Sequence, residues 1–126
     1  MKEKQLIAAA LGALANETGL TGHILPGDDA VVEFDLPACS VQLRVDARRH
    51  VRRSMIGSLR ARLQADGDLP GVLVCAYVDP ALAQALRDAD VQFIDTAGNA
   101  YLAFEGAWVF IKGEAKPNAV ATAECR

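Results

Sequence analysis

This 126-residue sequence contains no long apolar run, no cysteine pair and no familiar catalytic loop. No stretch approaches the roughly 20 consecutive apolar residues that a transmembrane helix needs. The three cysteines, Cys39, Cys75 and Cys125, form no CxxC motif and no obvious metal-binding set with His23 and His50. A glycine-rich phosphate loop, an HExxH helix and a nucleophile elbow are also missing. These absences argue against a membrane protein, a cysteine-rich metal site and the enzyme classes that those motifs define.

The cysteines that are present fit a reduced protein. Cys39 and Cys75 lie within or beside apolar segments, whereas Cys125 lies near the end of the chain. We therefore expect Cys39 and Cys75 to be inert thiols of the core, which is usual for a cytoplasmic protein.

The sequence does contain enough apolar material for one packed domain. Hydrophobic residues make up 52% of the chain, which favours a folded globule over disorder. We expect a single domain over residues 1–113. Residues 114–126 show no periodic pattern, so we expect a flexible tail or the start of a linker to a missing C-terminal domain.

The periodicity of apolar residues predicts three helices and six strands. The helices are expected at about 3–16, 51–64 and 80–89, and the strands at 30–36, 40–47, 72–78, 91–94, 100–104 and 107–112. Residues 20–28 contain two glycines and a proline, which favour a loop. The pair Asp79 and Pro80 is typical of a helix start. The predicted order, αββαβαβββ, indicates an α/β domain with a mixed β-sheet flanked by helices.

Positive charge is concentrated in one segment although the net charge is −3. Seven of the 13 basic residues fall between positions 44 and 62, where Asp46 is the only acid. Such a segment suits contacts to the phosphates of nucleic acid, and it also suits a solvated helix face that balances nearby acids. No aromatic residue lies within it, so stacking of single-stranded bases is not favoured there. The candidate phosphate contacts are Arg48, Arg49, Arg52, Arg53 and Arg60.

Two carboxylates and a cation form a second candidate site. Asp29 opens one predicted strand, and Asp46 and Arg48 share a face of the next. Carboxylates from adjacent strands can bind Mg²⁺ next to a cation, which is the geometry of a PD-(D/E)xK nuclease. The same residues equally suit a polar strand face whose charges are paired with one another. Arginine also stays protonated at any working pH, so it cannot act as an adjustable acid or base.

The sequence VQFIDTAGNAYLAF at 91–104 contains a compact polar corner between two apolar strands. Gly98 and Asn99 tolerate a left-handed backbone, and the side chains of Asp95 and Thr96 can bond the exposed amides of the corner. This interpretation makes the corner structural. The alternative is a ligand site, because ligands often bind at the carboxyl ends of strands in open α/β sheets.

Residues 72–102, VLVCAYVDPALAQALRDADVQFIDTAGNAYL, resemble the N-terminal region of transcriptional regulators related to the AbiEi-type antitoxins of bacterial type IV toxin–antitoxin systems. In that family a strand ends in a (Y/F)-(I/L)-D-x-A-G-N-A motif, which residues 93–100 match. The segment RVDARRHVR is also similar to the V-E-x-K strand and basic helix start of the family. The resemblance, which spans roughly 29–113, implies a restriction-endonuclease-like domain that is usually followed by a winged helix.

Position by position, the resemblance places Asp29 and Asp46 at the two acids of the nuclease motif and Arg48 at its lysine. Aspartate here replaces glutamate, and arginine replaces lysine, so the implied site is degenerate. The chain stops where the winged helix would begin, and residues 114–126 contain no helix-turn-helix pattern.

The sequence therefore predicts a non-catalytic nuclease-like domain of a DNA-binding antitoxin-type regulator, without a cofactor. Its expected partners are DNA, a cognate toxin or a second copy of the chain. One alternative is an active nuclease that binds Mg²⁺ through Asp29 and Asp46. Another is a protein–protein or dimerisation module that uses the edge of strand 107–113, where Trp108 and Phe110 share a face.

Overall fold

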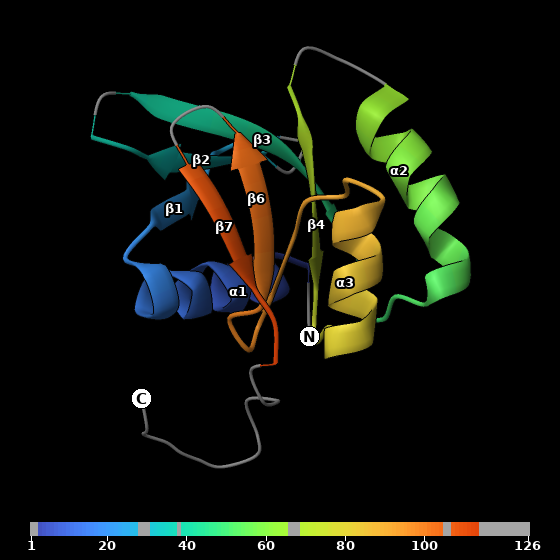
Figure 1. Ribbon diagram of the computed structural model, residues 1–126. Helices are drawn as coiled ribbons and strands as arrows, with labels where there is room; N and C mark the ends of the chain where they lie inside the picture. Colours follow the sequence, from blue (N-terminus) through green and yellow to red (C-terminus); the bar gives the residue numbers. More distant parts are fainter. Residues whose placement is uncertain (1–2, 28–30, 38, 66–68, 105–106, 114–126) are drawn as a thin grey trace.

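The computed structural model describes residues 3–27, 31–37, 39–65, 69–104 and 107–113 (Figure 1). The elements of the described residues, in chain order, are α1 (Glu3–Thr18), β1 (Thr21–Ile24), β2 (Val31–Asp35), β3 (Ser40–Ala47), the 3₁₀ helix η1 (Arg53–Met55), α2 (Ile56–Ala65), β4 (Gly71–Cys75), α3 (Pro80–Asp88), β5 (Phe93–Asp95), β6 (Ala100–Phe104) and β7 (Ala107–Ile111). The predicted tail, 114–126, lies outside the described residues, as does Cys125.

All seven strands form one sheet in which spatial order follows chain order, from β1 to β7. The central strand β4 runs parallel to β3 and β5, and the remaining neighbours are antiparallel. Every residue of β4 is buried, as a strand covered on both faces should be. The structure thus confirms the α/β class and the mixed sheet.

The helices cover opposite faces of the sheet and create two cores (Figure 1). On one face, α1 buries Ile7 and Leu14 against the strands. On the other face, α2 and α3 bury Leu59 and Leu86. The sheet is also curled on the α1 face, as the ring of Phe34 on β2 shows by stacking on that of Phe104 on β6 with centroids 5.9 Å apart.

The structure corrects the predicted element order. Residues 20–28 were expected to be a loop, but Thr21–Ile24 form the edge strand β1 paired with β2. The order within the described residues is therefore αβββαβαβββ, with the short η1 before the second helix. Gly22 weakened the strand pattern, although the fold requires it. A Cβ added at Gly22 would lie 2.6 Å from the Phe34 ring and 3.0 Å from Leu11.

The helix expected at 51–64 begins later than predicted. Arg52 is extended, with φ −118° and ψ 157°, and helical backbone starts at Arg53. The start of α3 agrees with the prediction, since the Asp79 side chain accepts a hydrogen bond of 2.8 Å from the Leu82 amide and Pro80 occupies the first turn.

The two described cysteines differ from each other. Cys75 is buried, as expected, and burial together with the nearby Asp95 carboxylate raises the pKa of its thiol. Cys39 is exposed, so its assignment to the core was wrong. It precedes the first residue of β3 and takes no part in the ladder between β2 and β3, which leaves its side chain outside the core.

Of the helices in the described part of the chain, none combines the length and apolarity needed to cross a bilayer.

Candidate functional site

The Asp95 corner between β5 and β6 is a buried hydrogen-bond network. The Asp95 carboxylate is fully buried and accepts four hydrogen bonds. Its Oδ1 accepts from the amides of Ala97 (2.8 Å) and Asn99 (2.9 Å). Its Oδ2 accepts from the amide of Val78 (2.7 Å) and from Nδ2 of Asn99 (2.8 Å). One carboxylate therefore joins the corner to the loop that follows β4.

The other polar residues of the corner complete this connection. The Thr96 hydroxyl donates to the carbonyl of Ala76 at 2.6 Å, so it bonds the residue that follows β4 and not the amides of its own corner. Asn99 is also fully buried and donates to the carbonyl of Val78 at 3.3 Å. Because Asp95 and Asn99 have no solvent exposure, they serve the structure and cannot contact a ligand directly.

Burial raises the pKa of Asp95, while the hydrogen bonds from Asn99, Val78 and Ala97 oppose that shift. Gly98 has φ +100°, the left-handed conformation expected for it. A Cβ at Gly98 would lie only 2.7 Å from Cγ of Glu17 at the end of α1. Both backbone conformation and close packing therefore require glycine at this position.

The basic segment 48–53 lies beside this corner. The Arg48 amide donates to the carbonyl of Val74, and the Ala76 amide donates to the carbonyl of Arg49 at 3.2 Å. The Thr96 amide in turn donates to the carbonyl of Ala76. Three neighbouring chain segments thus continue side by side past the carboxyl ends of the parallel strands β3, β4 and β5. This edge is where open α/β sheets usually bind ligands.

Four of the five predicted phosphate contacts belong to this edge, and one does not. Arg49, Arg52 and Arg53 are exposed, and Arg53 reaches the carbonyl of Ala81 at 3.5 Å near the start of α3. Arg48 is partly buried against Asp46. Arg60 instead lines a cleft of about 350 Å³ with residues 69–71 and 90–92, at the amino ends of β4 and β5.

The proposed metal ligand Asp46 is paired with arginines. Arg48 Nε lies 3.2 Å from Oδ1 of Asp46, and Arg62 Nε lies 3.3 Å from Oδ2. Each carboxylate oxygen therefore already has a positive partner, as the internally paired interpretation expects. Asp29 lies outside the described residues, so the structure places only two members of the Asp29, Asp46 and Arg48 set.

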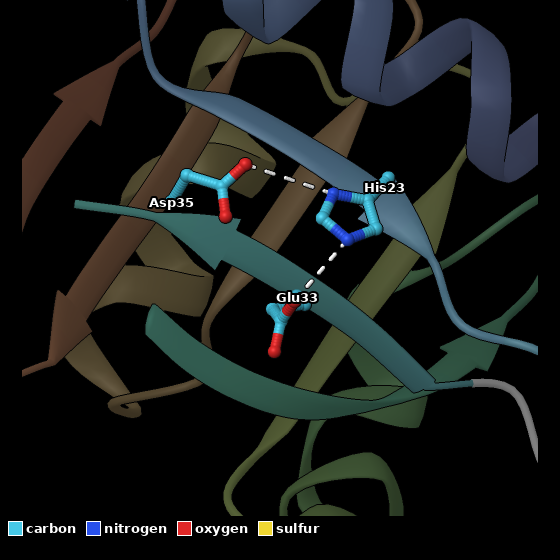
Figure 2. Close-up of side chains that lie close together, drawn as sticks. All are labelled: His23, Glu33 and Asp35. Atoms are coloured by element: carbon cyan, nitrogen blue, oxygen red, sulfur yellow. Dashed lines mark ion pairs between the residues drawn. The ribbon is translucent and has the colours of Figure 1, made fainter. Parts of the chain in front are cut away.

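A third polar group, His23 with Glu33 and Asp35, was not predicted from the sequence. His23 on β1 lies directly opposite Glu33 on β2, and Asp35 is two residues further along the same strand face. His23 Nε2 lies 3.2 Å from Glu33 and Nδ1 lies 3.8 Å from Asp35 (Figure 2). Alternating residues at 31–35 placed Glu33 and Asp35 on one face of a predicted strand. The partner His23 was not identified because a loop was expected where β1 forms.

Ligand atoms of these three side chains lie within 4.8 Å of one another, which would allow an ion to approach. The two ring nitrogens, however, face different carboxylates on opposite sides of the imidazole (Figure 2). One ion could therefore bind only one of the two ring nitrogens, and would leave the other with its carboxylate. Glu33 also accepts a hydrogen bond of 3.2 Å from Gln42 on β3. The arrangement is that of cross-strand pairs on a solvent-facing sheet surface.

Comparisons with known protein families, with curated proteins and with solved structures found no match to this chain.

Proposed function

We propose that the chain is a non-catalytic, nuclease-like domain of a DNA-binding, antitoxin-type regulator, and that residues 48–53 contact the phosphates of duplex DNA. The antitoxin and nuclease-like parts of this proposal rest on the resemblance of residues 72–102. The DNA contact rests on one structural observation. Arg49, Arg52 and Arg53 are exposed together at the carboxyl edge of the parallel strands, and no acid occurs between residues 47 and 65.

These arginines lie where a positive charge is unfavourable for the stability of the helix, which supports a role for them in binding. Arg52 and Arg53 occupy the start of the helical segment that η1 and α2 form, and no acid lies in the first turn of either element. The amino end of a helix carries partial positive charge, so cations there cost stability, on the order of 0.3–1 kcal/mol each when exposed. A phosphate at this end would be favoured by the helix and by the arginines together.

The residues around Asp46 support the proposal that this position has no nuclease activity. A nuclease of the PD-(D/E)xK type needs this carboxylate for Mg²⁺ and a cation whose pKa can be tuned. Here both oxygens of Asp46 are paired with Arg48 and Arg62, and arginine as a residue type cannot serve as an adjustable acid or base. The active nuclease therefore ranks second, and Mg²⁺-dependent cleavage that disappears in Asp46→Ala would restore it.

The test is retention of a labelled DNA duplex on a gel between about 50 and 200 mM salt. The double variant Arg49→Ala/Arg53→Ala should weaken binding by about tenfold or more and lower the slope of log K against log salt by about two, one for each lost phosphate contact. The control, Lys4→Ala/Arg87→Ala, removes the same charge from exposed sites on α1 and α3. No retention of the parent chain, or equal effects of both double variants, would contradict the proposal.

A further inference from the structure

The contact between Asp46 and its two arginines joins two elements. Arg48 follows the last residue of β3, and Arg62 lies in the last turn of α2. Each donates through Nε to a different oxygen of the same carboxylate. The Asp46 side chain is only 16% exposed, whereas those of Arg48 and Arg62 are 33% and 65% exposed. The acid is therefore the inner member of the group, and the two guanidinium groups lie outside it.

This geometry leaves the outer edges of both guanidinium groups available. A guanidinium has five N–H donors, and the Nε contact uses one of them. Among the described residues, no hydrogen bond joins the terminal nitrogens of Arg48 or Arg62 to an acceptor. Terminal nitrogens presented in this way suit the oxygens of a phosphate, which guanidinium groups bind through parallel hydrogen bonds.

We propose that Asp46 positions Arg48 and Arg62 as a two-arginine clamp for one backbone phosphate. This inference rests on the function proposed above and deepens it, because it adds Arg62 to the binding surface and gives Asp46 a positioning role. Holding two long side chains in place before binding reduces the entropy that the DNA contact must overcome. Asp46 thus increases affinity for a polyanion although it is itself negative.

Asp46 could position the two arginines, or it could only neutralise their charge. These two roles predict opposite effects of Asp46→Asn on DNA binding. Removing the acid makes the chain more positive by one charge, so charge balance alone predicts tighter DNA binding. The clamp predicts weaker binding, by about tenfold, because two arginine side chains lose their fixed orientation. The sign of the change therefore separates a positioning residue from a neutralising one.

The experiment measures fluorescence anisotropy of a labelled duplex with the full chain and five variants. Arg62→Ala and Arg48→Ala should each weaken binding by about tenfold and lower the salt slope by about one. Arg87→Ala, an exposed arginine on α3, is the matched control and should change neither quantity appreciably. Asp46→Asn should weaken binding, and adding Arg62→Ala to it should then cost less than in the parent chain.

A second measurement separates failure of the clamp from failure of DNA binding. Inorganic pyrophosphate is titrated while the Nε–H signals of the arginine side chains are followed by NMR. Shifts of the Arg48 and Arg62 signals that are lost in Asp46→Asn support the clamp, even if no DNA is retained. DNA binding in which Arg48→Ala, Arg62→Ala and Arg87→Ala behave alike, or which Asp46→Asn tightens, overturns the clamp and leaves the proposed contacts of Arg49, Arg52 and Arg53 standing. Absence of both DNA binding and pyrophosphate shifts overturns both.

Discussion

At the scale of single residues, the buried Asp95 carboxylate holds together two parts of the chain, the loop after β4 and the corner between β5 and β6. Its two oxygens accept four hydrogen bonds, and asparagine could offer only one acceptor oxygen in the same place. Asp95→Asn should therefore leave buried donors unsatisfied and lower the free energy of unfolding by about 3 kcal/mol. Urea unfolding followed by circular dichroism measures this loss. Asp88→Asn, at an exposed position on α3, is the control and should change stability little.

The same residue gives the protein a defined pH dependence. Burial raises the pKa of folded Asp95, so the folded state holds the proton more tightly than the unfolded chain does. This contribution to stability is fully present below about pH 4, the usual aspartate pKa, and is lost as pH rises through the raised value. The stability deficit of Asp95→Asn should accordingly be largest in acid and shrink towards neutrality. A deficit that grows with pH would contradict this assignment.

How much of this corner could be predicted from the sequence depends on how far its partners lie along the chain. The bonds from Asp95 to Ala97 and Asn99 are local, and such residues are known to bond nearby amides. The bond from Val78 spans 17 positions, and the bond from Thr96 to Ala76 spans 20. No pattern in the sequence indicates such partners, because they depend on how β4 and β5 are placed side by side.

At the scale of elements, the missed strand β1 shows where local patterns fail. Gly22 disfavours a strand by propensity, and only its contact with Phe34 and Leu11 explains why a larger residue is excluded. The basic helix was located correctly to within two residues, but its extended start at Arg52 was not predicted. Element types followed from periodicity, whereas ends and close contacts depended on tertiary packing.

Two glycine substitutions test this explanation. Gly22→Ala should lower the free energy of unfolding by about 1–3 kcal/mol, because the added methyl group would overlap the Phe34 ring. Gly12→Ala, in the middle of α1 with nothing within 4 Å of the added methyl group, should raise it by about 0.5–1 kcal/mol. Chemical denaturation of both variants measures the difference. Equal effects of the two substitutions would show that Gly22 does not pack against Phe34 of β2 and Leu11 of α1 as described.

At the scale of the whole molecule, the sheet separates two hydrophobic cores, and the sequence did not indicate that there would be two. Ile7 belongs to the core beneath α1, and Leu86 belongs to the core beneath α3. The periodicity of apolar residues located the elements, but the division of those residues between the two faces depends on strand order. The contact between Phe34 on β2 and Phe104 on β6 likewise depends on the whole sheet, because three other strands lie between β2 and β6.

The separation of the cores predicts how their substitutions combine. Ile7→Val should cost about 1 kcal/mol and Leu86→Ala about 2–5 kcal/mol, since both side chains are fully buried. Because the sheet lies between them and they share no core, the double variant should equal the sum to within about 0.5 kcal/mol. Ile7→Val with Ile94→Val, both in one core, is the comparison in which the effects should depart from a simple sum. All variants should still unfold in one transition, because both cores are built on the same strands and neither face can remain folded alone.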